Sequence, residues 1–179
     1  INRTETSITI KLKRLKLSND TYNEKHRTDK YKCNRLFISE IKPKNILDVY
    51  AGNSYYKKTT NIEVIDNDIK GIETNYKLDA FDFLFKFKKK KFDLIDLDPF
   101  GSAFNCFDLA LQIAQKGLII KTYQDFTPEK FNNYVIKRAK IYNKDLSIFI
   151  TKDYGNIMRT YFKIKLVEKS VSGKEYYKK

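Results

Sequence analysis

Four short runs of β-branched and aromatic residues alternate with helix-like stretches, and this order constrains the fold more than any other feature. The runs are NILDVY, NIEVID, FDLIDL and GLIIKTY, at residues 45–50, 61–66, 92–97 and 117–123. Runs this short and this apolar are typical of strands buried on both faces of a parallel sheet. Because strands and helices alternate, the sequence predicts an α/β fold with a doubly wound parallel sheet.

Three further segments have strand character. LSIFITKD (146–153) and MRTYFKIKLVE (158–168) are separated only by a short turn that contains Gly155. A connection of this length forces two strands to run antiparallel. Residues 7–17, SITIKLKRLKL, alternate apolar and basic side chains and predict a bulged strand or a short edge element. The expected sheet therefore has seven strands and is mostly parallel, with a C-terminal antiparallel hairpin.

Helices are predicted between the strands. Residues 28–41 have apolar side chains at roughly helical spacing and are followed by Pro43, which stops a helix. Residues 102–115 repeat apolar side chains at three- and four-residue steps, with Gly117 just beyond as a stop. A last helix is predicted from Thr127, a capping residue that precedes a proline.

Length and composition indicate one globular domain. The 179 residues lie in the single-domain range, and no apolar run approaches the ~18 residues of a membrane span. We expect the core domain at residues 28–168, a basic extension packing on it at 1–27, and a disordered tail at 169–179. Because the sequence opens on Ile1, the natural chain is expected to begin upstream.

The cysteines indicate the cell compartment of the protein, and its net charge indicates the class of its binding partner. Cys33 and Cys106 stand alone rather than in a CxxC pair, which favours a reducing, cytoplasmic location and argues against a metal site. The net charge of +14 favours a nucleic-acid partner, because clustered cations release counterions from a phosphate backbone. An AT-rich coding sequence would also enrich lysine, so the charge alone leaves both readings open.

The first candidate site motif is KPKNILDVYAGNS, residues 42–54. Asp48 ends a strand and is followed by the small residues Ala51, Gly52 and Asn53. Small residues at the carboxyl edge of a parallel sheet let the backbone approach a ligand. A single glycine is a poor match to the three-glycine fingerprint of dinucleotide sites, so a nicotinamide cofactor is disfavoured. A strand-to-helix turn without a ligand is the alternative.

Acidic residues follow the next two predicted elements. A strand ends at Asp66 and Asp68, and one of these carboxylates can accept both hydroxyls of a ribose, while the other caps a helix. Which of the two binds the ribose stays open. Asp79 and Ala80, on the following loop, can accept an adenine amine and leave room for its ring.

The strand at 92–97 ends in Asp98-Pro99-Phe100-Gly101. An exocyclic amine on a base is a poor nucleophile until its hydrogens are held, because its lone pair is delocalised into the ring. Asp98 can accept one N–H, the carbonyl of Pro99 can accept another, and Phe100 can stack on the base. The alternative is a tight turn in which Asp98 caps the next helix.

The other two aspartates of this strand, Asp93 and Asp96, are interpreted as strand residues without a role in the chemistry.

Together these motifs resemble one family. KPKNILDVYAG, NDI, DAFDFL, DLDPFGS and KGLIIKTYQDFTPE are similar to the catalytic domain of the tRNA (guanine-26) dimethyltransferases, whose hallmark is DPFG. Thr122, Asp125 and Pro128 match the family's segment after the fifth strand without a gap. The resemblance implies a Rossmann-like class I methyltransferase fold, S-adenosyl-L-methionine as methyl donor, a purine amine as acceptor, and tRNA as partner. It also implies that Asp98 holds and deprotonates the amine.

The resemblance assigns the cofactor residues position by position. It places the ribose on Asp68, the adenine on Asp79 and Ala80, and the methionine part on the Asp48 loop. An arginine precedes the family's first strand, and Arg27 lies at a matching distance from Asp48.

This chain departs from the family pattern in three ways. Ala103 stands where the family usually has proline, and Tyr56 stands where it usually has arginine. The sequence also ends about where the family's methyltransferase domain ends, before the second domain that grips tRNA.

The leading hypothesis is a methyltransferase acting on an amine of a nucleic-acid base, with tRNA guanine favoured. The alternatives are an amino-methyltransferase of DNA adenine or cytosine, which presents a related Asp-Pro-Pro-aromatic motif, and a nucleic-acid-binding module with a degenerate cofactor site. A small-molecule methyltransferase is disfavoured by the basic charge. A homo-oligomer that replaces the missing tRNA grip stays open.

Overall fold

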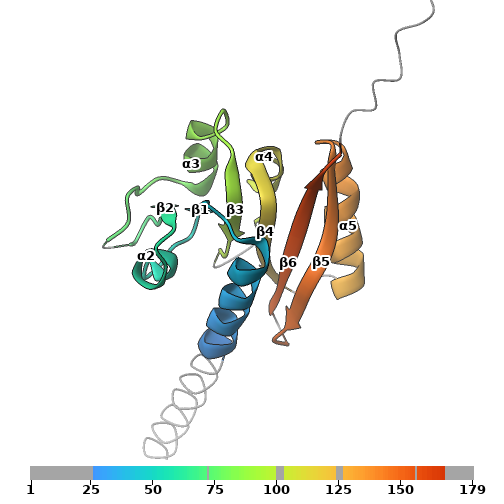
Figure 1. The fold of residues 1–179 in the computed structure, drawn as a ribbon, viewed down its shortest axis with the longest axis horizontal. Coiled ribbons are helices and arrows are strands. Elements are labelled where there is room, and N and C mark those ends of the chain that lie inside the picture. The colour runs from blue at the N-terminus through green and yellow to red at the C-terminus, as the bar shows by residue number, and fades with distance from the viewer. Residues whose placement is uncertain (1–25, 72, 100–102, 124–126, 156, 168–179) are drawn as a thin grey trace, which may run out of the picture. The chain divides into compact units, whose positions relative to one another are not determined.

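The strands form one mixed sheet (Figure 1). The computed structural model describes residues 26–71, 73–99, 103–123, 127–155 and 157–167. The strands are β1 (Asn45–Asp48), β2 (Glu63–Asp66), β3 (Phe92–Leu97), β4 (Ala114–Tyr123), β5 (Lys144–Asp153) and β6 (Ile157–Leu166). Their order in the sheet is β2-β1-β3-β4-β6-β5. β1 to β4 pair in parallel, and β6 pairs antiparallel with both β4 and β5.

The sheet confirms the expected α/β class but not the expected strand number. Among the described residues there are six strands rather than seven. The seventh, expected at residues 7–17, lies outside the described part of the chain. β5 and β6 form the C-terminal antiparallel hairpin that the short turn at Gly155 requires.

The chain divides after Glu40 into two units. In the first, the described residues from 26 onward form a helix that ends at residue 41. The second unit contains the whole sheet and the helices α2 (Tyr55–Thr59), α3 (Ala80–Lys86), α4 (Phe107–Ile113) and α5 (Pro128–Lys140). None of the helices in the described residues is long and apolar enough to cross a membrane.

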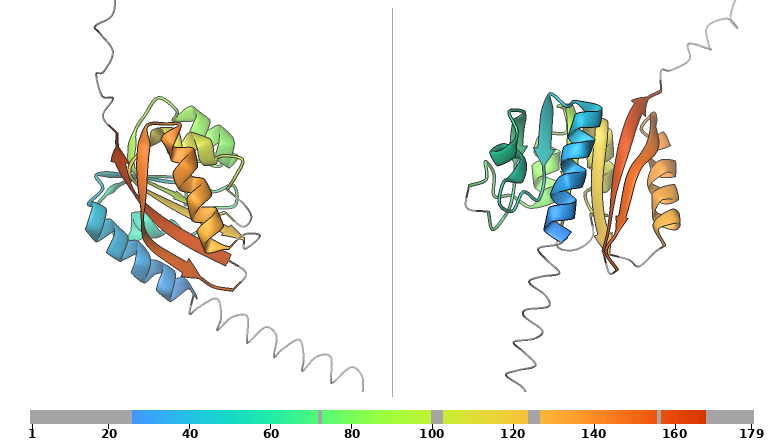
Figure 2. Two further views of the ribbon diagram at one scale, coloured as in Figure 1. Left: turned by 90° about the vertical axis from the view of Figure 1, so that its right-hand side faces the viewer. Right: turned by 60° about the horizontal axis from the view of Figure 1, so that its bottom comes forward.

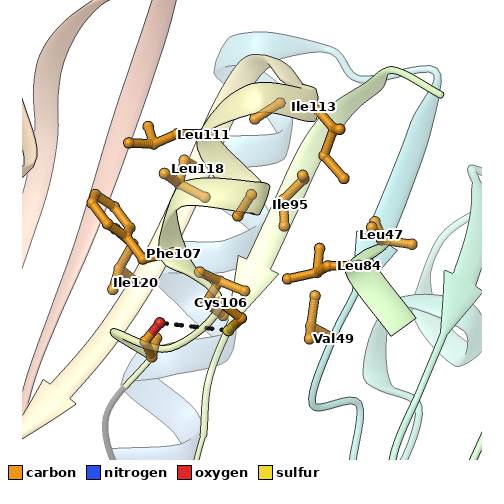
Figure 3. Close-up of a cluster of buried hydrophobic side chains, with 14 of the residues drawn as sticks. Leu47, Val49, Leu84, Ile95, Cys106, Phe107, Leu111, Ile113, Leu118 and Ile120 are labelled. Atoms are coloured by element: carbon orange, nitrogen blue, oxygen red, sulfur yellow. Dashed lines mark hydrogen bonds between the residues drawn. The ribbon is translucent and has the colours of Figure 1, made fainter. Parts of the chain in front are cut away.

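The apolar core lies between one face of the sheet and helices α3, α4 and α5. Leu47 of β1, Ile95 of β3 and Leu118 of β4 meet Leu84 of α3 and Leu111 of α4, and all five side chains are fully buried (Figure 3). α5 lies alongside β5 (Figure 2). Because strand side chains alternate between faces, the residues next to these apolar positions point to the opposite face of the sheet.

The fourth helix is shorter than its sequence predicts. The apolar repeat extends over residues 102–115, but α4 ends at Ile113 and β4 begins directly at Ala114, before the expected stop at Gly117. Ala114 already has extended backbone and pairs with Phe92 of β3. Strand pairing therefore overrides the helical repeat in the last turn.

Lys144 accounts for the abrupt end of α4. Its side chain is buried, at 3% exposure, and its Nζ donates to the carbonyls of Leu111 and Ala114. A cation at this end of a helix satisfies carbonyls that have no intrahelical partner. Burial, with a smaller contribution from the charge of Lys91, lowers the pKa of Lys144 to about 8.

Replacing Lys144 with methionine is expected to remove a pH-dependent part of the stability. Below pH 8 the ammonium is charged in both the folded and the unfolded protein, so this group does not make the free energy of unfolding depend on pH. Between pH 8 and the ordinary lysine value the unfolded chain binds more protons, so the wild-type protein gains stability as pH rises. From pH 7 to 10 the wild type should gain roughly 2 kcal/mol over Lys144→Met, measured by urea unfolding. A constant difference across this range would contradict the assignment.

Candidate active site

Three buried carboxylates lie side by side at the carboxyl edge of the sheet. Asp48 of β1 is the register partner of both Asp66 of β2 and Asp96 of β3. All three side chains are buried and lie on the face opposite the apolar core, because register partners in a parallel sheet share a face. Buried carboxylates repel one another and require compensating donors or cations. Each of the three carboxylates therefore needs hydrogen-bond donors or cations from the surrounding structure.

Asp66 is compensated by the chain that follows β2. Its Oδ1 accepts a 2.7 Å hydrogen bond from the backbone N–H of Asn75 and lies 3.6 Å from the Nζ of Lys57. The carboxylate is fully buried. These contacts tie the loop after β2 back to its strand.

Asp68 and the first motif loop lie at one cleft. The Oδ2 of Asp68 accepts a 2.9 Å hydrogen bond from the backbone N–H of Gly52, and its Oδ1 accepts one of 2.8 Å from the backbone N–H of Lys70. Gly52 has φ of 53°, a left-handed conformation that glycine adopts without strain. The cleft has a volume of about 380 Å³ and is lined by Gly52, Asn53, Lys58, Asp68, Lys70, Gly71 and Glu73. Two of the sequence motifs thus meet at a cavity large enough for a small ligand.

Asp79 and Ala80 begin α3. The side chain of Asp79 accepts a 2.8 Å hydrogen bond from the N–H of Phe81 and so caps the helix, while Ala80 is buried in the apolar cluster. The sequence analysis expected Asp66 or Asp68 to cap the helix that follows β2, and this prediction is wrong, because Asp79 caps α3.

Asn67, which the sequence analysis did not single out, joins these loops. Its side-chain Nδ2 donates to the carbonyls of Val49 and Leu78, and its Oδ1 accepts from the N–H of Leu78. Its backbone carbonyl accepts from the N–H of Ala51. One buried amide thus connects the first motif loop to the segment that precedes Asp79.

Asp98 follows the last residue of β3 and lies between two cations. Its Oδ2 is 2.9 Å from a guanidinium nitrogen of Arg159, on β6, and its Oδ1 is 3.4 Å from the Nζ of Lys121, on β4. The side chain of Asp98 is 11% exposed. Opposite charges at these distances favour the ionised form of a carboxylate.

Asp96 lies in β3, as the sequence analysis expected, and it also pairs with Arg159. The second terminal nitrogen of Arg159 donates to the Oδ2 of Asp96 at 2.6 Å, and the hydroxyl of Tyr56 donates to the same oxygen at 2.6 Å. Asp96 is therefore the centre of a buried polar network. The strand alternation indicated its face, but its partners come from elements far away in the sequence.

The network shifts the ionisation of its members. Burial alone would lower the pKa of Arg159, but the carboxylates of Asp96 and Asp98 hold that pKa well above its ordinary value. Burial and the nearby charge of Asp96 raise the pKa of Tyr56 well above the ordinary tyrosine value. Arg159 therefore stays a cation, and Tyr56 stays a neutral hydrogen-bond donor.

Other predicted residues lie apart or outside the described chain. Pro99 is described and buried, whereas Phe100, Gly101 and Asp125 fall outside the described residues. Arg27 is an exposed residue of the first unit, which is described by itself. The N-cap position of α4 is Cys106, whose side chain makes no capping hydrogen bond, so Asp98 does not occupy the helix-capping position considered as its alternative.

The parallel strands, the C-terminal hairpin and the acidic loops at the carboxyl edge define a methyltransferase fold of the α/β class. Residues 37–128, about half of the chain, match the model of the family described as N2,N2-dimethylguanosine tRNA methyltransferase. The chain belongs to this family.

Solved structures share the fold at low identity. Trm1 from Pyrococcus horikoshii, solved with S-adenosyl-L-methionine, has a TM-score of 0.60 and 18% identity over 73% of this chain and 53% of its own. The Escherichia coli protein yhhF, provisionally assigned as a methyltransferase, has a TM-score of 0.55 and 12% identity over 80% of this chain and 86% of its own. This chain thus spans about half the length of the Pyrococcus Trm1 structure. No curated protein matches the sequence.

Removing the side-chain amide of Asn67 is expected to destabilise the protein. Asn67→Ala leaves several buried backbone groups without partners and should lower the free energy of unfolding by on the order of 3 kcal/mol. Asn133→Ala, on the exposed face of α5, is the control and should change stability by less than about 0.5 kcal/mol. Urea unfolding of both variants measures the difference, and equal losses would contradict the connecting role of Asn67.

Proposed function

We propose that this protein transfers a methyl group from S-adenosyl-L-methionine to the exocyclic amine of a guanine in tRNA. The observation that carries the proposal is the partly buried carboxylate of Asp98, which pairs with Arg159 and Lys121 just beyond the end of β3 in a chain of the dimethylguanosine family. The donor cleft and the acceptor carboxylate come from the same edge of the sheet, where open parallel sheets bind ligands.

The chemistry of the cleft fits the cofactor. Asp68 presents a carboxylate in the cleft and is the better of the two candidates for the ribose hydroxyls, because Asp66 is fully buried. The backbone of Ala51, Gly52 and Asn53 can approach the ligand closely, since this loop has small side chains and a left-handed glycine.

The remaining donor assignments follow the family. Asp48, with the adjacent acids, gives the edge a negative character suited to the positive charges of the methionine part. Asp79 and Ala80 are proposed for the adenine. When bound, the cofactor supplies a methyl group on a positively charged sulfur that leaves as a neutral thioether.

Asp98 is proposed to activate the acceptor. Its carboxylate accepts a hydrogen bond from the guanine amine and orients the nitrogen lone pair toward the methyl group. As the carbon–nitrogen bond forms and the carbon–sulfur bond breaks, the nitrogen becomes positive and its proton passes to Asp98. The carbonyl of Pro99 is proposed to hold the other amine hydrogen, and Phe100 to stack on the base. Such positioning contributes up to ~7–11 kcal/mol to a transfer reaction.

The choice of tRNA rests on the family and on charge. The family is named for dimethylguanosine in tRNA, and the net charge of +14 suits a phosphate backbone. Transfer of tritium from labelled cofactor to tRNA and to duplex DNA separates RNA from DNA as acceptor. Label in tRNA alone supports the proposal. Label in DNA alone supports a DNA amino-methyltransferase, and label in neither contradicts both.

Asp68→Asn is expected to weaken cofactor binding. Loss of the charge on the ribose hydrogen bonds should raise the Kd for S-adenosyl-L-methionine by about 10- to 100-fold, equivalent to ~1.5–3 kcal/mol. The control is Glu73→Gln, a carboxylate that lines the same cleft but is exposed and paired with Lys58. Calorimetry gives both values, and wild-type affinity in Asp68→Asn would rule out its ribose role.

Asp98→Asn is expected to separate binding from transfer. The amide cannot accept the amine proton, so kcat should fall by at least about 100-fold while the Kd for the cofactor stays near the wild-type value. Asp93→Asn, at the start of the same strand and paired with Lys116, is the control and should keep its activity. Near-normal turnover of Asp98→Asn in the tritium assay would refute the role of Asp98.

A further inference from the structure

We propose that Arg159 is the positioning residue of the acceptor site. It fixes the carboxylate of Asp98 and links it through Asp96 to Tyr56, in the helix that follows the predicted cofactor loop. The inference rests on the proposed role of Asp98 and adds to it a residue that lies sixty-one positions away in the sequence, on the C-terminal hairpin.

The guanidinium of Arg159 is held at all three of its nitrogens. One terminal nitrogen is 2.6 Å from Asp96, the other is 2.9 Å from Asp98, and Nε donates to the hydroxyl of Tyr161 at 3.0 Å. The side chain is 2% exposed. A planar group with three fixed contacts cannot rotate without breaking one of them. The orientation of Asp98 is therefore coupled, through Arg159, to Asp96 on β3 and to Tyr161 on β6.

Sheet register explains how residues so distant in sequence meet. Arg159 of β6 is the register partner of Lys121 of β4, and Leu97 of β3 is the partner of Ile120. Asp98, one residue beyond Leu97, therefore lies beside Lys121. Lys121 of β4, Arg159 of β6 and Asp98, which directly follows β3, thus lie next to one another.

Charge in this group is balanced. The carboxylates of Asp96 and Asp98 face the cations of Arg159 and Lys121, with Tyr56 as a neutral donor. Burying a guanidinium is costly, and removing one partner of a buried ion pair leaves an uncompensated charge. Asp96 alone would give Arg159 one counter-charge inside the sheet. Asp98 gives Arg159 a second counter-charge, and this contact fixes a side chain that lies just beyond the end of β3.

The two carboxylate oxygens of Asp98 have different surroundings. Oδ2 faces Arg159, which is 2% exposed, and Oδ1 faces Lys121, which is 18% exposed. Oδ2 is therefore the anchored oxygen, and Oδ1, on the more open side, is the one that receives the amine hydrogen.

Tyr56 extends the network to the donor side. It lies in α2, directly after the loop of Ala51, Gly52 and Asn53, and donates to the same oxygen of Asp96 that Arg159 contacts. Donor loop and acceptor carboxylate thus share one rigid set of contacts, and a transfer reaction requires their alignment.

The test compares three variants with the wild-type protein in the tritium assay with tRNA. Arg159→Ala removes the anchor, and added guanidinium ion can refill the space. Lys121→Met removes the partly exposed cation with little packing change. Arg138→Met is the matched control, because Arg138 forms a similar two-point pair with Asp108, between α5 and α4. Cofactor affinity, measured by calorimetry, verifies folding of each variant.

Arg159→Ala is expected to lose at least about 30-fold in kcat at unchanged cofactor Kd, with partial recovery in guanidinium, because orientation is lost but not binding. Lys121→Met should shift the acid limb of the pH–rate profile upward by ~1 pH unit, since the carboxylate loses a nearby cation. Arg138→Met should match the wild type in both measurements.

Failure of the inference is distinguishable from failure of the proposed function. If the wild type transfers no label to tRNA, the proposed function and this inference fall together. If the wild type transfers label but Arg159→Ala keeps its kcat and Lys121→Met keeps its acid limb, only the positioning role is overturned. Should Arg159→Ala not fold, the acid limb of Lys121→Met decides alone.

Discussion

A single buried guanidinium, that of Arg159, allows two carboxylates to sit at the end of the central strand. Asp96 is in register with Asp48, which in turn is in register with Asp66, so three acids share one buried edge. Without an internal cation at Asp96 this edge would be strongly unfavourable. The C-terminal hairpin supplies the cation, because the antiparallel pairing of β6 with β4 brings Arg159 to the face that carries the acids. The hairpin is thus part of the site as well as of the sheet.

The fold was largely predictable from the sequence because its strands are short, apolar and separated by helices. The runs at 45–50, 61–66 and 92–97 contain β1, β2 and β3, and the turn at Gly155 required the hairpin. The start of β4 was wrong by three residues. There the helical repeat continued to residue 115, but pairing of Ala114 with Phe92 and the contacts of Lys144 ended the helix earlier. The local spacing of apolar residues cannot predict that contacts with distant residues will end a helix early.

The site was predictable where its residues lie in the loops that follow the parallel strands. The meeting of Gly52 with Asp68 follows from the rule that loops at the carboxyl edge of parallel strands converge. Arg159 and Asn67 could not be found in this way. Arg159 reaches Asp98 because of the register in which β6 pairs with β4, and the sequence alone does not give this register. Asn67 forms hydrogen bonds to backbone groups of other loops. Tyr56 was noticed as a departure from the family pattern, and its hydroxyl shares Asp96 with the arginine of β6.

The central claim, methyl transfer to the exocyclic amine of a tRNA guanine, is tested most directly by nucleoside analysis. Transfer RNA incubated with the protein and S-adenosyl-L-methionine would be digested, and its nucleosides separated and identified by mass spectrometry. The account predicts guanosine methylated at N2. Methylation of another base, methylation of a ring nitrogen, or no methylated nucleoside from a protein that binds the cofactor would contradict it.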